Sequence, residues 1–194
     1  MKFIIGVDEA GRGPLAGPVS VGVIMAPARF DIAKEFPGVA DSKKLTEKKR
    51  EALFSLLEER SRNGDLMFSV QFGDHAAIDA EGISSVIRAA VARGINSLCS
   101  DSQTARVLLD GSLKAPPEYA QETIIGGDAS VPIISLASIA AKVVRDRHMN
   151  ELARTYPEYG FEKHKGYGTK LHYETLQKYG LSPIHRTTYI HLVK

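Results

Sequence analysis

The sequence predicts an α/β protein with a mixed β-sheet flanked by helices. Near its start, apolar runs at 3–5 and 19–25 border a stretch rich in glycine and proline, which predicts two antiparallel strands joined by a turn. After residue 46, patterns typical of helices alternate with short apolar runs typical of strands. Paired strands followed by such alternation favour a sheet with both parallel and antiparallel neighbours.

The later elements are predicted from residue spacing and from the residues that begin or end them. Thr46 is a typical N-cap, and Asn63 and Gly64 end the helix that follows. The longest predicted helix covers 133–153. The other expected elements are helices from 83 to about 94–98 and over 170–179, and strands over 66–72, 106–110 and 122–125.

Length and cysteine content narrow the class of protein. A chain of 194 residues suits a single domain. The lone Cys99 excludes an internal disulfide and indicates a reducing compartment. The first apolar run is too short for a signal peptide or a membrane span, so we expect a cytoplasmic protein without a membrane partner.

Charge is distributed unevenly along the chain. Residues 142–194 hold 10 Lys and Arg against 5 Asp and Glu, whereas residues 1–141 hold 15 against 18. If the two parts line opposite sides of one groove, the arrangement suits a polyanionic partner such as nucleic acid. The alternative is an ordinary solvated basic face.

Acidic residues recur where predicted strands end. Asp8 and Glu9 follow the first strand, Asp110 closes another, and Asp128 follows a third. The carboxyl ends of strands in an open α/β sheet gather ligands, and Mg²⁺ prefers oxygen donors. These acids therefore predict a site for one or two divalent ions, as in phosphodiester hydrolysis. The alternative is that each is an ordinary turn residue.

Strand geometry separates Asp8 from Glu9. Neighbouring residues in a strand point to opposite faces, so both side chains reach one ion only if the chain turns at Glu9. Otherwise Glu9 contributes through a water or its backbone carbonyl. Asp8 is therefore the first choice for a bridging ligand.

The segment DEAGRGPLAGP at 8–18 resembles the signature of the ribonuclease HII family. The likeness extends nearly to the end of the chain, through DSKKL at 41–45, LDG at 109–111, ASIAAKV at 137–143, HKGYGT at 164–169 and SPIHR at 182–186. The resemblance implies an RNase H-like fold over 1–194, with a small helical substrate-binding part at about 155–194. It also implies metal-dependent cleavage of RNA in RNA–DNA hybrids and at single ribonucleotides in duplex DNA.

The resemblance places the catalytic and metal-binding acids at Asp8, Glu9, Asp110 and Asp128, with two Mg²⁺ or Mn²⁺ ions as cofactors. Asp146 competes with Asp128 for the fourth position. Asp146 lies one helical turn from Lys142 and between two arginines, which favours a structural ion pair. We therefore assign the fourth ligand to Asp128.

The substrate contacts are expected on the basic and glycine-rich motifs. Arg12 lies between two glycines, where its guanidinium fork suits a sugar-phosphate backbone. Tyr167 lies among lysines and suits stacking on a base or sugar. An exposed turn arginine and a tyrosine packed under a loop are the alternatives. The expected contacts are Gly11, Arg12, Gly13, Lys43, Ser138, Lys142, Lys165 and Tyr167.

The combined interpretation is a monomeric endonuclease that cuts 5′ of a ribonucleotide and leaves a 3′-hydroxyl and a 5′-phosphate. Two alternatives stay open. One is another RNase H-like metal-dependent nuclease without preference for the junction, and the other is a non-catalytic module that binds hybrids.

Overall fold

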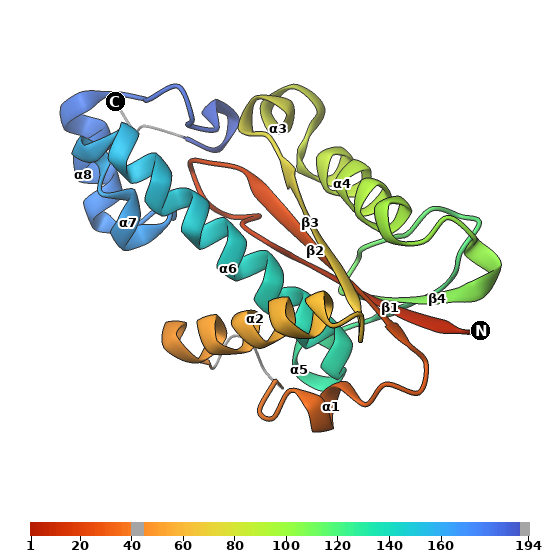
Figure 1. Cartoon of the computed structure of the whole chain (residues 1–194). Coiled ribbons are helices and arrows are strands. Elements are labelled where there is room, and N and C mark those ends of the chain that lie inside the picture. Colours follow the sequence, from red (N-terminus) through yellow and green to blue (C-terminus); the bar gives the residue numbers. More distant parts are fainter. Residues whose placement is uncertain (40–44, 191–194) are drawn as a thin grey trace.

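The two strands at the start of the chain form the centre of a five-stranded sheet. β1 (Phe3–Ala10) pairs antiparallel with β2 (Val19–Pro27) and parallel with β4 (Ala105–Asp110). β3 (Met67–Gly73) and β5 (Ala120–Ile124) lie at the edges, giving the order β3-β2-β1-β4-β5. The predicted mixed sheet is therefore confirmed (Figure 1).

The computed structural model describes residues 1–39 and 45–190. The sequence predicted its longer helices but not the four short ones, α1, α3, α5 and α7, whose four to seven residues are too few to show a helical period. The helices are α1 (Ile32–Glu35), α2 (Glu47–Arg62), α3 (His75–Glu81), α4 (Ile83–Leu98), α5 (Gly127–Ser130), α6 (Pro132–Thr155), α7 (Phe161–His164) and α8 (Lys170–Tyr179).

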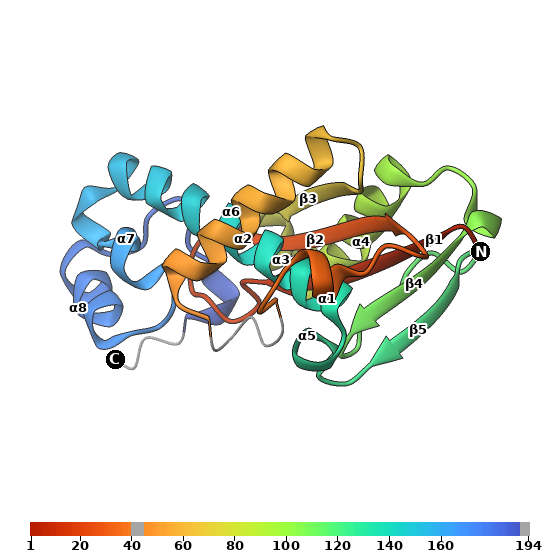
Figure 2. The same ribbon diagram turned by 60° about the horizontal axis from the view of Figure 1, so that its bottom comes forward.

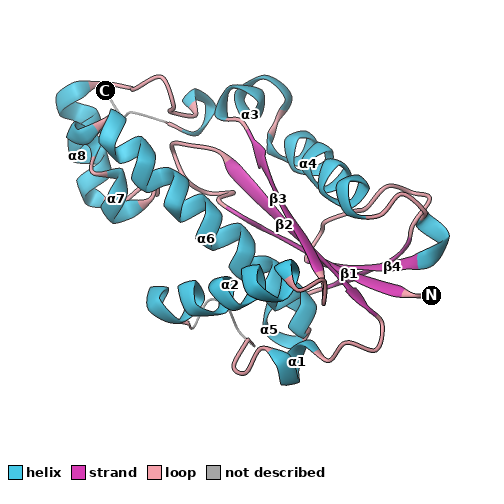
Figure 3. Cartoon of the chain, in the orientation of Figure 1, coloured by secondary structure: helices cyan, strands magenta, loops and turns pink. Residues whose placement is uncertain are grey.

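Helices cover both faces of the sheet (Figure 3). On one face, α3 and α4 pack against apolar side chains of β1, β2 and β4, in a cluster that includes Val7, Val21 and Val91. On the other face, α1, α2 and α6 form a second apolar cluster with Ile24 and Leu57. The central strands are therefore buried from both sides, which explains their continuous apolar sequences.

α6 lies unusually close to the central strands because the sheet presents a glycine beneath it. A Cβ added to Gly22 would come 2.2 Å from the carbonyl oxygen of Ala137. α6 also buries residues on most of its circumference, as expected for a helix with apolar contacts all round. Even so, among the described residues no helix combines the length and apolar character required to cross a bilayer.

The C-terminal helices α7 and α8 lie beside one end of α6 (Figure 2). They share a third apolar cluster with that end of α6 and with the loop after β1, through Leu15, Met149, Phe161 and Leu176. The backbone N–H of Leu15 also donates to the carbonyl oxygen of Gly166 at 2.8 Å. The glycine-rich loop after β1 is thus held between the sheet and the C-terminal helices.

Candidate active site

A cavity of about 410 Å³ opens at the carboxyl ends of β1 and β4. The parallel pairing of the two strands ends at Val7 and Leu109, so the residues that follow diverge and leave space between them. Its lining includes most of the residues expected from the sequence, together with Ala10 and Arg50: Asp8, Glu9, Ala10, Gly11, Arg12, Gly13, Arg50, Asp110, Ser138, Lys142 and Tyr167.

Asp8 is the most buried acid of this cavity, with 4% of its surface exposed. Its carboxylate accepts a hydrogen bond from the backbone N–H of Glu9 at 2.8 Å and another from the Ser138 hydroxyl. Burial, together with the negative charges of Glu9 and Asp110, raises the pKa of Asp8 to about 8. The negative charges of Glu9 and Asp110 therefore oppose the ionisation of Asp8 in the absence of a cation.

Glu9 lines the same cavity although it neighbours Asp8 in a strand. β1 continues to Ala10, so the turn at Glu9 that would have brought both acids together does not occur. Instead the side chain of Glu9 reaches the cavity from the end of the strand and forms an ion pair with Arg12, at 3.1 Å. Burial raises the pKa of Glu9, and the Arg12 guanidinium counteracts that rise.

Asp128 lies next to Asp110 but is not part of the cavity lining. Its backbone N–H donates to Asp110 Oδ1 at 3.3 Å, and its carbonyl oxygen accepts from the Ser135 hydroxyl at 2.6 Å. The residue is buried in the first turn of α5, not in a simple turn after a strand. Its assignment as the fourth metal ligand stays a prediction.

The donor chemistry of the acidic residues fits a divalent cation. Carboxylate oxygens are hard donors, and a cation among them would relieve the repulsion that raises the pKa of Asp8. In the described residues, no three His, Cys, Asp or Glu side chains are arranged to hold an ion unaided. Mg²⁺ sites in proteins commonly use one or two carboxylates and complete the coordination shell with waters and substrate phosphates.

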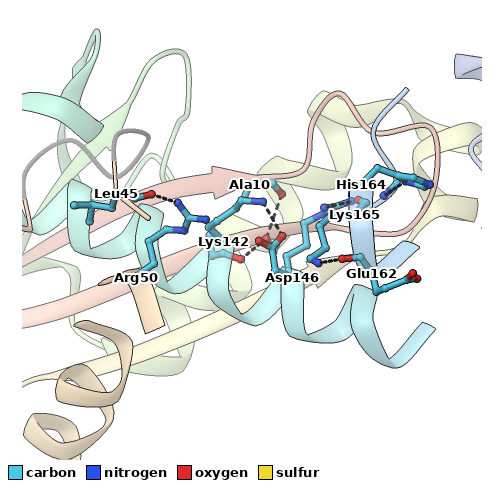
Figure 4. A network of polar contacts seen from close by, with 12 residues as sticks. Ala10, Leu45, Arg50, Lys142, Asp146, Glu162, His164 and Lys165 are labelled. Atoms are coloured by element: carbon cyan, nitrogen blue, oxygen red, sulfur yellow. Dashed lines mark hydrogen bonds and ion pairs between the residues drawn. The ribbon is translucent and has the colours of Figure 1, made fainter. Parts of the chain in front are cut away.

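Cationic side chains approach the cavity from α2 and α6. The ammonium of Lys142 lies 2.7 Å from Asp146 Oδ1, which confirms the ion pair predicted between them (Figure 4). Arg50, which the sequence analysis did not single out, donates to the carbonyl oxygen of Leu45 and also lines the cavity. Lys142 thus contacts Asp146 and also lines the cavity.

Tyr167 completes the cavity on the side of the C-terminal helices. Its ring lies 5.7 Å from the Lys142 ammonium and 5.7 Å from the Arg145 guanidinium. These distances suit cation–π contacts, which orient the ring while leaving 39% of the residue exposed. The ring is therefore both fixed in place and accessible to a ligand.

Two buried arginines, which the sequence analysis missed, hold the glycine-rich loop. Arg145 donates to the carbonyl oxygens of Ala16, Pro18 and Lys165 at 2.8–3.3 Å. Burial lowers its pKa to about 10, so it stays charged at neutral pH. The sequence signal that could have identified Arg145 is a charged residue within the otherwise apolar helix α6.

The second of these arginines, Arg186, holds the start of the same loop. It donates to the carbonyl oxygens of Gly11, Arg12 and Gly17 at 2.7–2.9 Å. Neither arginine is exposed to solvent, and the guanidinium of each donates hydrogen bonds to three backbone carbonyls. Gly11 has a φ of +91°, and a Cβ there would come 2.1 Å from Arg145 Nε. Only glycine therefore suits this position.

A chain of hydrogen bonds through two histidines ends at the backbone carbonyl of Tyr167. The N–H of Ser182 donates to His185 Nδ1 at 2.8 Å, which leaves His185 Nε2 to donate to His172 Nε2 at 3.0 Å. His172 Nδ1 then donates to the carbonyl oxygen of Tyr167 at 3.0 Å. This arrangement requires neutral rings, and burial lowers the pKa of His172 to about 4.

Of two further lysines expected at the substrate, one does not line the cavity and the other lies outside the residues that the structure describes. The Lys165 ammonium contacts the carbonyl oxygen of Glu162, and Lys165 is not part of the cavity lining (Figure 4). Lys43 lies outside the described residues. The structure therefore gathers six of the eight expected substrate contacts around the cavity.

A mixed sheet in this order, with carboxylates at the ends of β1 and β4, defines the class of RNase H-like nucleases. The chain is similar in structure to the ribonuclease H2 of Pyrococcus horikoshii OT3, with a TM-score of 0.76, 31% identity, and coverage of 96% of this chain and 93% of that one. The RNase HII of Archaeoglobus fulgidus, solved in a complex with PCNA, shares the fold with a TM-score of 0.79 at 23% identity, over 99% and 97% of the two chains. Bst-RNase HIII in complex with Mn²⁺ shares it with a TM-score of 0.69 at 20% identity, over 92% and 63%.

Sequence relatives narrow the class to one family. The family model described as Ribonuclease HII matches residues 5–192. The Ribonuclease HII of Endomicrobium trichonymphae is 46% identical over 187 residues, which cover 96% of this chain and 84% of that protein. That of Bacillus cytotoxicus is 42% identical over 97% and 69% of the two chains. The chain belongs to the ribonuclease HII family. It is a type 2 ribonuclease H, which is a hydrolase.

Proposed function

We propose that this chain cuts the RNA strand of RNA–DNA hybrids and also cuts 5′ of single ribonucleotides embedded in duplex DNA. One observation carries the proposal: Asp8, Glu9 and Asp110 share a cavity with the 11–13 backbone and with Tyr167. The acids supply a place for metal-assisted hydrolysis. The loop and the ring line the same cavity, where the sugar on each side of the cut would lie.

Asp8, Glu9 and Asp110, with Asp128 as the fourth acid, would hold two Mg²⁺ or Mn²⁺ ions. When bound, such ions lower the pKa of an attacking water and neutralise the leaving oxygen. Within the protein, the Ser138 hydroxyl and the Glu9 N–H orient the Asp8 carboxylate toward the cavity. The expected products are a 3′-hydroxyl and a 5′-phosphate.

Recognition of the ribose would come from the backbone of the glycine-rich loop. Gly13 has open space where a side chain would lie, so its backbone is accessible to a sugar. Backbone N–H and C=O groups of residues 11–13 suit a 2′-hydroxyl, which both donates and accepts. Arg12, whose side chain is 44% exposed, is placed to contact the adjoining phosphate.

Tyr167 would favour DNA immediately beyond the ribonucleotide. Its partly exposed ring, held by Lys142 and Arg145, presents a flat surface on which a deoxyribose can pack. A 2′-hydroxyl on that sugar would crowd the ring. The loop and the ring together would therefore select a junction between RNA and DNA.

The deciding experiment is digestion of a DNA duplex with one ribonucleotide, read at nucleotide resolution with and without Mg²⁺ or Mn²⁺. We expect one cut, 5′ of the ribonucleotide, that requires the metal. Efficient cutting of continuous hybrids with none at the single ribonucleotide would favour a nuclease without junction preference. Binding without any cleavage would favour a non-catalytic hybrid-binding module.

We also propose that the chain acts as a cytoplasmic monomer, with residues 155–194 as the part that carries Tyr167 to the substrate. The single Cys99 is buried, which suits a reducing compartment. Light scattering of the purified protein tests the monomer, because a dimer would double the measured mass.

A further inference from the structure

A second cavity of about 160 Å³ lies beside the active site, and Arg12 lines both cavities. The second cavity is formed by the first half of α4 and by the segment that follows β4. Because β4 ends with Asp110, this segment begins directly after one of the catalytic acids. The two cavities are therefore neighbours along one surface of the protein.

The polar lining of the second cavity is cationic. Its lining includes Arg12, Arg88 and Lys114 together with Ser84 and Ser112, and no Asp or Glu of the described residues belongs to it. Within residues 1–39 and 45–190, neither Arg88 nor Lys114 forms an ion pair or a side-chain hydrogen bond, whereas Arg12 pairs with Glu9. Arg88 and Lys114 are like charges without a counter-charge, and such charges raise the local affinity for an anion.

The size and chemistry of the cavity identify the kind of anion. A volume of 160 Å³ corresponds to several water molecules at about 30 Å³ each, which is enough for a phosphate group. A nucleobase commonly stacks on an aromatic side chain, and no aromatic residue in the described part of the chain lines this cavity. Arg, Lys and Ser are residues that commonly contact backbone phosphates.

We propose that this cavity binds one backbone phosphate of the nucleic-acid duplex while the neighbouring cavity holds the bond to be cut. The proposal rests on the proposed function, because it takes the duplex as the ligand. Arg12 lines both cavities and so links the bound phosphate to the acidic site. The contact fixes the register of the duplex, so it affects binding and not the chemical step.

The test combines protein variants with duplexes in which single phosphates are made neutral. Arg88→Ala and Lys114→Ala remove cations from the cavity, and Arg93→Ala is the matched control because it removes one cation from the same helix outside the cavity. Binding of a ribonucleotide-containing duplex is measured by fluorescence anisotropy without divalent metal, so that no cleavage occurs. Each phosphate in turn is replaced by an uncharged methylphosphonate.

We expect one methylphosphonate position to weaken binding to the unmodified protein and to Arg93→Ala, but to have little further effect on Arg88→Ala or Lys114→Ala. These two variants should also lower the slope of log affinity against log salt by about one unit each. In cleavage assays they should raise KM several-fold and leave kcat unchanged.

The proposal is overturned if every methylphosphonate weakens Arg88→Ala as much as it weakens the unmodified protein. Absence of cleavage on every duplex would overturn the proposed function alone, because the binding experiment does not depend on cleavage.

Discussion

The lining of the cavity has two parts that are built in different ways. In the acidic part, Asp8 and Asp110 lie near the carboxyl ends of neighbouring parallel strands, so the backbone pairing of the sheet brings them together. In the loop part, the glycine-rich loop and Tyr167 are placed by buried side chains that bind backbone carbonyls. The acidic part needs only the sheet, whereas the loop part depends on hydrogen bonds from α6, α8 and the segment that follows α8.

This difference separates the residues expected to act in catalysis from those that support the cavity. The acids Asp8, Glu9 and Asp110 repel one another, which lowers stability. Residues that support the loop part, such as Arg145 and His172, contribute stability and position without lining the cavity. Substitutions in the two groups should therefore have opposite effects on activity and on the free energy of unfolding.

The largest effect is expected for Asp8→Asn. Removing this carboxylate should lower the rate of cleavage by several orders of magnitude, while the melting temperature above pH 8, where metal-free Asp8 is ionised, stays the same or rises because Glu9 and Asp110 lose a repulsive neighbour. Activity assays and thermal unfolding measure the two quantities. Asp128→Asn should also lower cleavage, whereas Asp146→Asn, which loses the ion pair with Lys142, should mainly lower stability. Loss of cleavage in a folded Asp146→Asn, with Asp128→Asn active, would contradict the choice of the fourth ligand.

The histidines below Tyr167 should make stability depend on pH. His172 has a pKa of about 4 in the folded protein against 6.5 in an unfolded chain. Between these values the unfolded state binds more protons, so the free energy of unfolding should fall as the pH decreases from 6.5 to 4. The loss from this buried group amounts to about 3 kcal/mol at most.

Urea unfolding at a series of pH values measures this dependence, with His172→Gln as the comparison. The variant should show a shallower decline in stability between pH 6.5 and 4. An equally steep decline in the variant would show that other groups cause it.

Of the two glycines that flank Arg12, we expect Gly11 to be required for stability and Gly13 for substrate binding. Gly11→Ala places a side chain against Arg145 at a positive φ, and we expect a loss of about 2 kcal/mol in the free energy of unfolding. Gly13→Ala meets no atom within 4 Å, so it should fold normally and weaken only substrate binding. Denaturant unfolding and anisotropy with a hybrid duplex separate the two losses. Equal destabilisation by both substitutions would refute this distinction.

The smallest effect is expected at the ring that faces the substrate. Tyr167→Phe should keep most activity if the ring surface matters, since Phe preserves that surface. Tyr167→Ala should lose about tenfold on a duplex with a single ribonucleotide, from the loss of stacking, and less on a continuous hybrid. Cleavage rates on both substrates provide the measurement. Equal losses would indicate a general backbone contact instead of junction recognition.

Much of the fold was predictable because its signals are local. The apolar runs of β1 and β2, the N-cap Thr46 and the apolar length of α6 each indicate one element directly. The short helices were not predictable, since four to seven residues show no helical period. Strand alternation did not indicate that Glu9 would line the same cavity as Asp8, and whether both side chains bind one ion stays a prediction.

The sequence by itself determined the acidic half of the site. Acids placed at the ends of adjacent parallel strands meet once the sheet forms, so Asp8 and Asp110 were identifiable from their positions in the chain. Only the tertiary structure decided how the other half is held. Arg186 contacts the carbonyl of Gly11 across 175 residues of chain, and Arg145 reaches that of Pro18 across 127. Every residue has a backbone carbonyl, so the sequence of the accepting segment does not show which distant side chain will donate to it.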